Sequence, residues 1–136
     1  MSYAMSAALQ EAVYTALSAD GDLGAVVGTD IYDAIPSGAV PSLYVALGPE
    51  QVRNDDDKTG SGAEHVFVVS VVTEAPGFSS AKVAAGLVCD VLHDAPLTLS
   101  RGRLVSMRFR SAKAARIEKG TGRKIDLTFR ARVEDD

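Results

Sequence analysis

The stretch that decides the fold is KIDLTFRARV, which runs from Lys124 to Val133. Apolar and polar residues alternate along it without a break. The apolar set falls on one side of an extended chain and comprises Ile125, Leu127, Phe129, Ala131 and Val133. This period predicts a strand with one buried face and one face in water. The expected context is an antiparallel sheet whose outer face carries charge.

Three earlier segments also have the composition of strands. Residues 42–48 (SLYVALG) alternate, with Tyr44 pointing outward. Residues 66–73 (VFVVSVVT) are apolar on both faces, so we expect them inside the sheet, with a helix or a partner subunit covering the second side. Residues 103–110 alternate as well. One face of that strand carries Val105, Met107 and Phe109.

Two segments have the spacing of amphipathic helices. Apolar residues recur at every third or fourth position in residues 6–18, and again from residue 79 or 80, where a serine would cap the helix, to about residue 93. The apolar stripe of this second helix is Val83, Ala84, Leu87, Val88, Val91 and Leu92. Between the two helices we expect a short helical turn with Asp22 as N-cap and Gly28 as its stop.

Two polar segments, 49–63 and 111–123, contain glycine and lack a period, so we expect long loops there. The tail Glu134–Asp136 is expected to fray. The element order is then α-α-β-β-α-β-β. This order predicts a single α+β domain over residues 1–136, with an antiparallel sheet of four strands or slightly more and the helices packed on one face.

The composition, 46% hydrophobic and 24% charged, is that of a globular protein. The single cysteine, Cys89, cannot form an internal disulfide, which favours a reducing compartment. The N-terminus lacks the pattern of a signal peptide, and no stretch is long and apolar enough to span a bilayer. We therefore expect a cytosolic chain with no membrane contact.

Charge is divided unevenly along the chain. Residues 1–100 contain 3 Lys/Arg and 13 Asp/Glu, a net of −10, whereas residues 101–136 contain 11 and 5, a net of +6. A basic segment on an acidic body is typical of a nucleic-acid surface. It is also typical of self-association, in which the basic face of one copy meets the acidic face of the next. Self-association is favoured, because the basic residues alternate with core residues and no exposed aromatics lie between them.

The acidic run Asp55–Asp57 is a candidate cation site. With Asp55 at position one, however, Val66 stands where a calcium loop requires Glu, so the run is interpreted as a solvated loop. His65 and His93 lack both an i,i+4 histidine and a nearby cysteine pair, which argues against zinc. A favourable interaction with the helix dipole accounts for His93 near a helix C-terminus.

No constellation typical of an enzyme is found. Cys89 adjoins the apolar stripe of its helix and is interpreted as a small buried hydrophobe. Residues 120–124 (GTGRK) lack the spacing of a phosphate loop and precede a strand, so they read as a turn. A G-x-S-x-G nucleophile motif does not occur. We expect no catalytic residues, no metal and no cofactor.

Several pieces of the chain match one protein family, and in that family's order. They are SADGDLGAVVG (18–28), IYDAIP (31–36), SLYVALG (42–48), VFVVSVVTEAPGFSSAK (66–82), VLHDAPLTLSRGRLVSMRFR (91–110) and KIDLTFRAR (124–132). The most specific pieces are LHDAPLTL (92–99) and DIYDAIP (30–36). The chain resembles the small tail-completion, or tail-terminator, proteins of long-tailed phages and of phage-derived gene transfer agents.

The resemblance implies a structural role without catalytic residues. Such proteins form a ring, usually a hexamer, that caps the finished tail tube and provides the surface to which the DNA-filled head is joined. The implied partners are further copies of the chain, the tail tube protein and a head-side connector or stopper protein. The implied location is the tail or neck of a virion or virion-like particle, assembled in the bacterial cytoplasm.

Candidate ring contacts lie in the two polar segments. They are Arg53, Asp55, Asp56, Asp57 and Lys58 in the first and Lys113, Arg116, Glu118, Lys119 and Arg123 in the second. Both segments are long enough to reach neighbouring rings and to become ordered on binding. The alternative is that both are solvated hairpin tips.

A rival reading from another class is a small DNA-binding module. Its candidate basic face is Arg108, Arg110, Arg130 and Arg132, which lie at i,i+2 spacing on two strands. If those strands are neighbours, the four side chains make one patch, and binding to duplex DNA would depend steeply on salt. Within the ring hypothesis, some of the same side chains would line a channel through which DNA passes.

Overall fold

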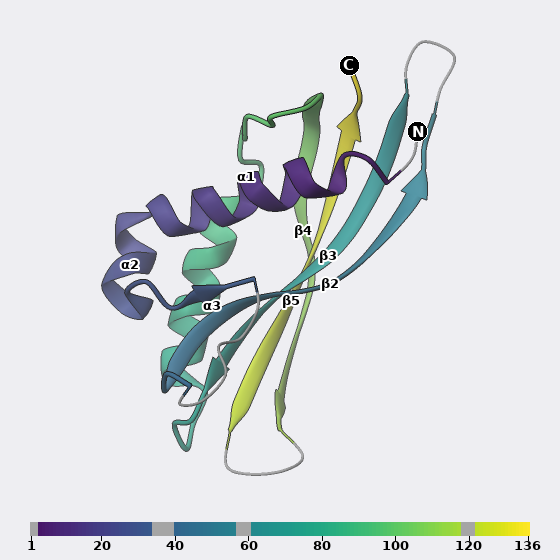
Figure 1. Cartoon of the computed structure of the whole chain (residues 1–136). Helices are drawn as coiled ribbons and strands as arrows, with labels where there is room; N and C mark the ends of the chain where they lie inside the picture. The colour runs from purple at the N-terminus through teal and green to yellow at the C-terminus, as the bar shows by residue number, and fades with distance from the viewer. Residues whose placement is uncertain (1–2, 34–39, 57–60, 118–121) are drawn as a thin grey trace.

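A computed structural model describes residues 3–33, 40–56, 61–117 and 122–136. It contains three helices and a five-stranded sheet (Figure 1). The elements are α1 (Ser6–Ala19), α2 (Gly21–Val27), β1 (Ile31–Tyr32), β2 (Leu43–Asn54), β3 (Gly62–Thr73), α3 (Ser79–Leu92), β4 (Arg103–Arg116) and β5 (Arg123–Glu134). Among the described helices, none is long and apolar enough to cross a membrane.

The strand order is β1-β2-β3-β5-β4. Strands β2 to β5 pair antiparallel, as the sequence predicts, and all the helices lie on one side of the sheet (Figure 1). The expected four-stranded sheet gains a fifth member, because β1 pairs parallel to β2. The sheet is therefore mixed. A strand of two residues is too short to show a period in the sequence, so it was not predicted.

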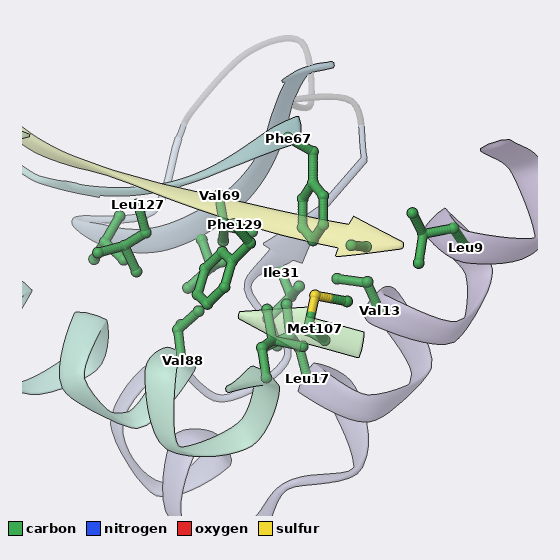
Figure 2. Close-up of a cluster of buried hydrophobic side chains, with 14 of the residues drawn as sticks. Leu9, Val13, Leu17, Ile31, Phe67, Val69, Val88, Met107, Leu127 and Phe129 are labelled. Carbon is green, nitrogen blue, oxygen red and sulfur yellow. The ribbon is translucent and has the colours of Figure 1, made fainter. Parts of the chain in front are cut away.

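The core lies between the helices and the inner face of the sheet. All five apolar residues of the 124–133 stretch are buried there, which confirms the strand predicted from their alternation. Figure 2 shows Leu9, Val13 and Leu17 of α1 and Val88 of α3 directed toward the sheet. Phe129 is fully buried at the centre, with its ring 5.8 Å from that of Phe67 and 5.9 Å from that of Phe109.

The prediction of long loops at 49–63 and 111–123 is wrong for residues 49–54 and 111–116, which lie in strands, while residues 57–60 and 118–121 lie outside the described residues. Strand β2 continues to Asn54 and pairs with β3 from Gly62, while β4 continues to Arg116 and pairs with β5 from Arg123. These ends project past the helical layer, so that residues 111–116 are largely exposed on both faces (Figure 1). A strand with no buried face has no hydrophobic alternation, which explains why the sequence pattern did not find residues 111–116. In β2, an irregularity between Leu47 and Glu50 breaks the alternation, and Glu50 and Val52 occupy the inward positions beyond it.

Strand β4 is interrupted by two irregularities in its pairing with β5. One lies between Leu104 and Ser106, and the other between Phe109 and Ser111. The first turns Val105 out, leaving it 43% exposed, and Leu104 packs against the core instead. The predicted inner face is therefore correct for Met107 and for Phe109, whose ring packs against Phe129, but wrong for Val105.

Two predicted helix starts are also corrected. The N-cap of α2 is Asp20, whose carboxylate accepts from the Leu23 N–H at 2.9 Å, and not Asp22. Helix α3 begins after Phe78 with no side-chain cap. Within α3 the buried stripe is Ala81, Ala84, Ala85, Val88 and Leu92, while the predicted Val83 is 55% exposed. The predicted stop at Gly28 is confirmed, with φ of 61°.

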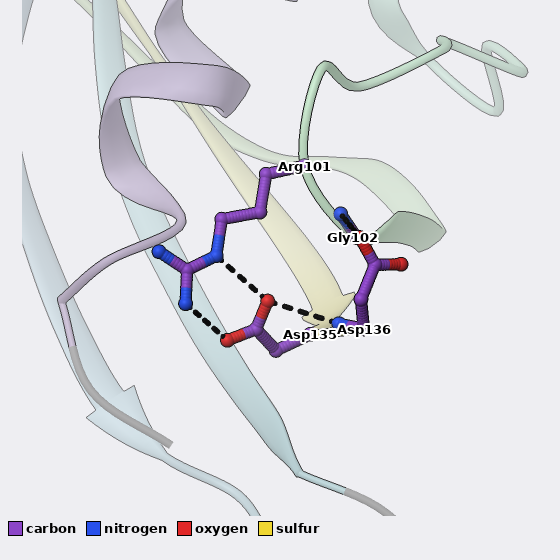
Figure 3. Close-up of polar contacts among 4 residues, drawn as sticks. All are labelled: Arg101, Gly102, Asp135 and Asp136. Carbon is purple, nitrogen blue, oxygen red and sulfur yellow. Dashed lines mark hydrogen bonds and ion pairs between the residues drawn. The ribbon is translucent and has the colours of Figure 1, made fainter.

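The C-terminal residues do not fray, contrary to the prediction. Arg101 donates from Nε and Nη2 to the two carboxylate oxygens of Asp135, at 2.8 and 2.7 Å (Figure 3). The Gly102 N–H donates to Asp136 Oδ2 at 3.1 Å, and the Asp135 N–H donates to the Ser61 carbonyl at 3.1 Å. The tail is thereby tied to the start of β4 and to the β2–β3 hairpin.

Candidate assembly surfaces

The side of the sheet turned away from the helices is open. Strand β3 lies at its centre, as predicted for a segment that is apolar on both faces. We call this side the outer face; its residues include Ala46, Val66, Val68, Ser70, Val72, Arg108, Thr128, Arg130 and Arg132. The valines of β3 on this face are half-buried by their neighbours in the sheet. The outer face is thus largely apolar along its middle strand and charged toward both ends, with Arg108, Arg130 and Arg132 at one end and Lys124 and Asp126 at the other.

The four arginines of the predicted basic face meet on this surface. Arg108 of β4 lies directly opposite Arg130 of β5, and Arg132 lies opposite Ser106. Arg110 occupies the second irregularity of β4, beside them. A hollow at this place is lined by Arg53, Asp55, Glu64, Arg108, Phe109, Arg110 and Arg130. Strands β4 and β5 are therefore neighbours, as the predicted basic face required.

Only part of this positive charge is neutralised within the chain. Arg130 pairs with Glu64 at 2.7 Å, and Arg132 pairs with Asp55. Arg108 and Arg110 form no ion pair with any residue that the structure describes. Because like charges directly opposite each other across two strands are unfavourable, the Arg108–Arg130 pair costs the isolated chain some stability.

The candidate ring contacts of the first polar segment lie at the end of the β2–β3 hairpin. Arg53 is on β2 and faces Glu64 across the strands. Asp55 is held by Arg132, and the Asp56 carboxylate accepts from the Gly62 N–H at 3.0 Å. Asp57 and Lys58 lie outside the described residues.

The candidates of the second segment separate into two kinds. Lys113 and Arg116 lie on β4, on an edge strand and not in a loop, and their side chains are exposed. Arg123 begins β5 and has a packing role, because its guanidinium lies 5.4 Å from the centre of the Phe78 ring and donates to the Ala75 carbonyl at 3.2 Å. Glu118 and Lys119 lie outside the described residues.

The opposite edge of the sheet is acidic. No Lys or Arg precedes Arg53 in the sequence. The edge around β1 carries Asp30 and Asp33, and a groove between it and α1 is lined by Ala7, Gln10, Glu11, Tyr14, Asp33 and Leu47. The Tyr32 hydroxyl donates to Asp30 at 2.6 Å. That hydrogen bond, burial and the negative charge of Asp30 raise the pKa of Tyr32.

A polar cluster that sequence reasoning missed ties the N-terminus to the sheet. Glu50 Oε1 accepts from the hydroxyls of Tyr3 and Ser6, at 2.7 and 2.6 Å, and Glu50 Oε2 lies 3.0 Å from Nδ1 of the fully buried His65. Burial of the Glu50 carboxyl acts to raise its pKa, but the hydrogen bonds from His65, Ser6 and Tyr3 outweigh burial, and the net pKa is lowered. His65 alternates with Phe67 and Val69 on the inner face of β3. Had the predicted strand begun at Gly62 instead of at residue 66, this alternation would have indicated that His65 is buried.

The remaining candidates for chemistry have structural partners. His93 caps α3, and its Nδ1 accepts from the Phe109 N–H at 3.0 Å, which joins the helix end to β4. Burial and the neighbouring Asp90 raise the pKa of the Cys89 thiol, which disfavours the reactive thiolate. Among the described residues, no three His, Cys, Asp or Glu side chains are grouped as a metal site.

Two comparisons with known proteins cover most of the chain. Residues 11–134 match a family model described as tail completion protein gp17. A chain in the solved structure of the virion of a native gene transfer agent particle is 58% identical, with a TM-score of 0.92, over 98% of this chain and 99% of that chain. Among curated proteins there is no match.

Proposed function

The chain belongs to the tail completion protein gp17 family, whose members are structural proteins of virion tails, and we propose that it forms a ring that caps the finished tail tube and joins the tail to the DNA-filled head. The observation that carries the proposal is the end-to-end match, at 58% identity, to a chain of a gene transfer agent virion. Over a match of that extent the fold is shared. The role is structural and not catalytic.

The proposed partners are further copies of the chain, in a ring of six, together with the tail tube protein on one side and a head-side connector or stopper protein on the other. The proposed place is the tail or neck of a virion-like particle. A ring requires two different, complementary surfaces on each copy, so that each contact repeats around the circle and closes. The two surfaces that we propose are the acidic edge at β1 and the edge of β4 that carries Arg110, Lys113 and Arg116.

The outer face offers the ring a second source of binding energy. The valines of β3 and the neighbouring Ala46 and Thr128 give it an apolar middle. Burying such surface contributes about 25 cal/mol per Å². A tail tube or head connector that covers this face would add affinity, while charged residues at its margin would set orientation.

DNA contact is the second candidate function. It is favoured by Arg108 and Arg110, which have no ion-pair partner among the described residues and stand beside Arg130. In a ring, these side chains would line the channel and meet phosphates. A titration of the purified protein against duplex DNA tests this: affinity that falls steeply with salt supports it, and flat, weak binding removes it.

Electron microscopy of particles from cells that lack this protein tests the main proposal. We expect filled heads beside unattached or abnormally long tails. Complete particles with normal tails would remove the terminating and joining role.

A further inference from the structure

We propose that the seam of the ring is made edge to edge, with the β4 edge of one copy lying against the β1 edge of the next. The basic edge is residues 110–116 of β4, and the acidic edge is residues 30–33 together with Glu11 of α1. The inference rests on the proposed ring and names the surfaces that would close it.

The two edges lie at the same level of the sheet. Pairing registers connect them in rows that run across all five strands. One row is Tyr32, Ala46, Ser70, Asp126 and Lys113, and the next is Ile31, Val45, Val71, Ile125 and Ala114. If a neighbouring copy continues the sheet without a shift along the strands, its β1 meets residues 113 and 114 of β4.

Strand direction also fits. Strand β1 is parallel to β2, and three antiparallel pairings follow from β2 to β4, so β4 runs antiparallel to β1. A second copy placed beside the first in the same orientation would therefore pair its β1 antiparallel with β4. The new pair would have the geometry of most of this sheet.

The β4 edge is covered over only part of its length. Near its middle, the Asp94 N–H donates to the Met107 carbonyl at 2.7 Å, and the Phe109 N–H donates to His93 Nδ1 at 3.0 Å. Beyond Phe109, the described part of the chain provides no backbone partner on the side away from β5. An exposed edge of this kind is a template for another strand. The fold thus closes one half of the edge and leaves the other open.

Charge selects which edges meet. Arg110, Lys113 and Arg116 stand on the open half of β4, with no acidic residue between them. The β1 edge carries Asp30, Asp33 and the nearby Glu11, with no cation in the first 52 residues. Two basic edges repel each other, which disfavours a symmetric β4–β4 dimer. Basic against acidic gives a head-to-tail contact, the kind that closes into a ring.

The test couples amines to carboxylates with a zero-length carbodiimide in purified particles. Lys113 would join to Asp30, Asp33 or Glu11 of the adjacent copy, and denaturing gels would show a ladder that ends at the ring size. In the matched variant Lys113→Arg the positive charge is kept but the reactive amine is lost. Particles should still assemble, and the bands above monomer should largely disappear, with peptide mass spectrometry identifying the lost link.

Charge exchange gives a second measurement. Lys113→Glu and Asp33→Lys should each lower the yield of joined particles roughly tenfold, because like charges then face each other, and the double variant should recover most of the yield. A ladder unchanged by Lys113→Arg, or no recovery in the double variant, would overturn the edge-to-edge seam and leave the ring intact. Particles that contain no copies of this chain would instead overturn the proposed function.

Discussion

The two edges of the sheet are finished in different ways. At the N-terminal edge, β1 is only two residues long and lies beside α1 in an acidic setting. At the other edge, β4 runs for 14 residues and passes the end of the helices (Figure 1). Its sequence beyond Phe109 contains Arg110, Lys113 and Arg116. Monomeric proteins usually keep edge strands short or covered. This difference is the observation on which the proposed edge-to-edge seam rests.

The largest effect is expected from a substitution of Phe129, the β5 residue at the centre of the core. Phe129→Ala takes away a fully buried ring that packs on both Phe67 and Phe109, so unfolding free energy should fall by about 3–5 kcal/mol. Denaturant unfolding followed by circular dichroism measures this. The control is Phe109→Ala, whose ring is 39% exposed and should cost roughly 1 kcal/mol. Equal losses would contradict a core centred on Phe129.

A second prediction concerns Glu50, whose carboxylate lies 3.0 Å from the ring of the buried His65. In Glu50→Gln the hydrogen bonds from Tyr3 and Ser6 can persist, but the ionised partner of His65 is lost. We expect a loss of about 1–2 kcal/mol, toward the low end of charged hydrogen bonds because Glu50 is partly exposed.

The same variant has a predicted pH signature. The pKa of Glu50 is lowered in the folded protein from its ordinary value of 4.5. Its contribution is therefore complete above that pH and is lost as pH falls through the folded pKa. Melting temperatures between pH 3 and pH 7 should fall less steeply toward acid in Glu50→Gln than in the parent. Parallel curves would show that this carboxylate does not contribute.

The third prediction separates stability from assembly at the basic edge. Arg108→Thr removes one of two like charges that face each other and places a β-branched residue in a strand, so the isolated chain should gain up to roughly 0.5–1 kcal/mol. Arg130→Thr is the matched control, because it removes the same repulsion but leaves Glu64 without its partner, and should bring no gain. Thermal melts compare them, and a loss in Arg108→Thr would mean that Arg108 has a stabilising contact.

The smallest effect is expected from loss of the contact between Arg101 and Asp135. Arg101→Ala breaks the two-point contact with Asp135, both groups being at the surface (Figure 3). The melting temperature should fall slightly in low salt, and the difference should vanish near 1 M salt, where charges are screened within about 3 Å. A large loss that persists in high salt would indicate a packing role for Arg101.

The parts of the fold that the sequence predicts are those with one buried face. The 124–133 strand and helix α1 place their apolar residues against one another, so their periods are readable. Strand β3 was predicted from a continuous apolar run and not from a period. Residues 111–116 are largely exposed on both faces and were mistaken for a loop. Residues 49–54 were mistaken for a loop because an irregularity between Leu47 and Glu50 breaks the period, and the inward positions that follow hold Glu50 and the half-buried Val52. The choice between Asp20 and Asp22 as N-cap depends on local backbone geometry, which spacing does not determine.

The candidate assembly surfaces also include parts that the sequence predicts and parts that it does not. Alternation along the two strands placed Arg108 and Arg110 on one face and Arg130 and Arg132 on another, but their meeting depended on the strands being neighbours, which the strand order shows. The Glu50 cluster was not predictable, since Tyr3 and His65 reach it from separate parts of the chain and no local pattern links them. The open β4 edge likewise follows only from the strand order.

A cryo-electron microscopy reconstruction of the joint between tail and head, in particles that carry this chain, tests the account most directly. We predict a closed ring of this chain between the tail tube and the head connector, in which β4 of each copy runs antiparallel beside β1 of the next. A joint that lacks the chain would contradict the proposed function. A ring whose copies meet through other surfaces, with the β4 edge exposed to solvent, would contradict the reading of the two edges.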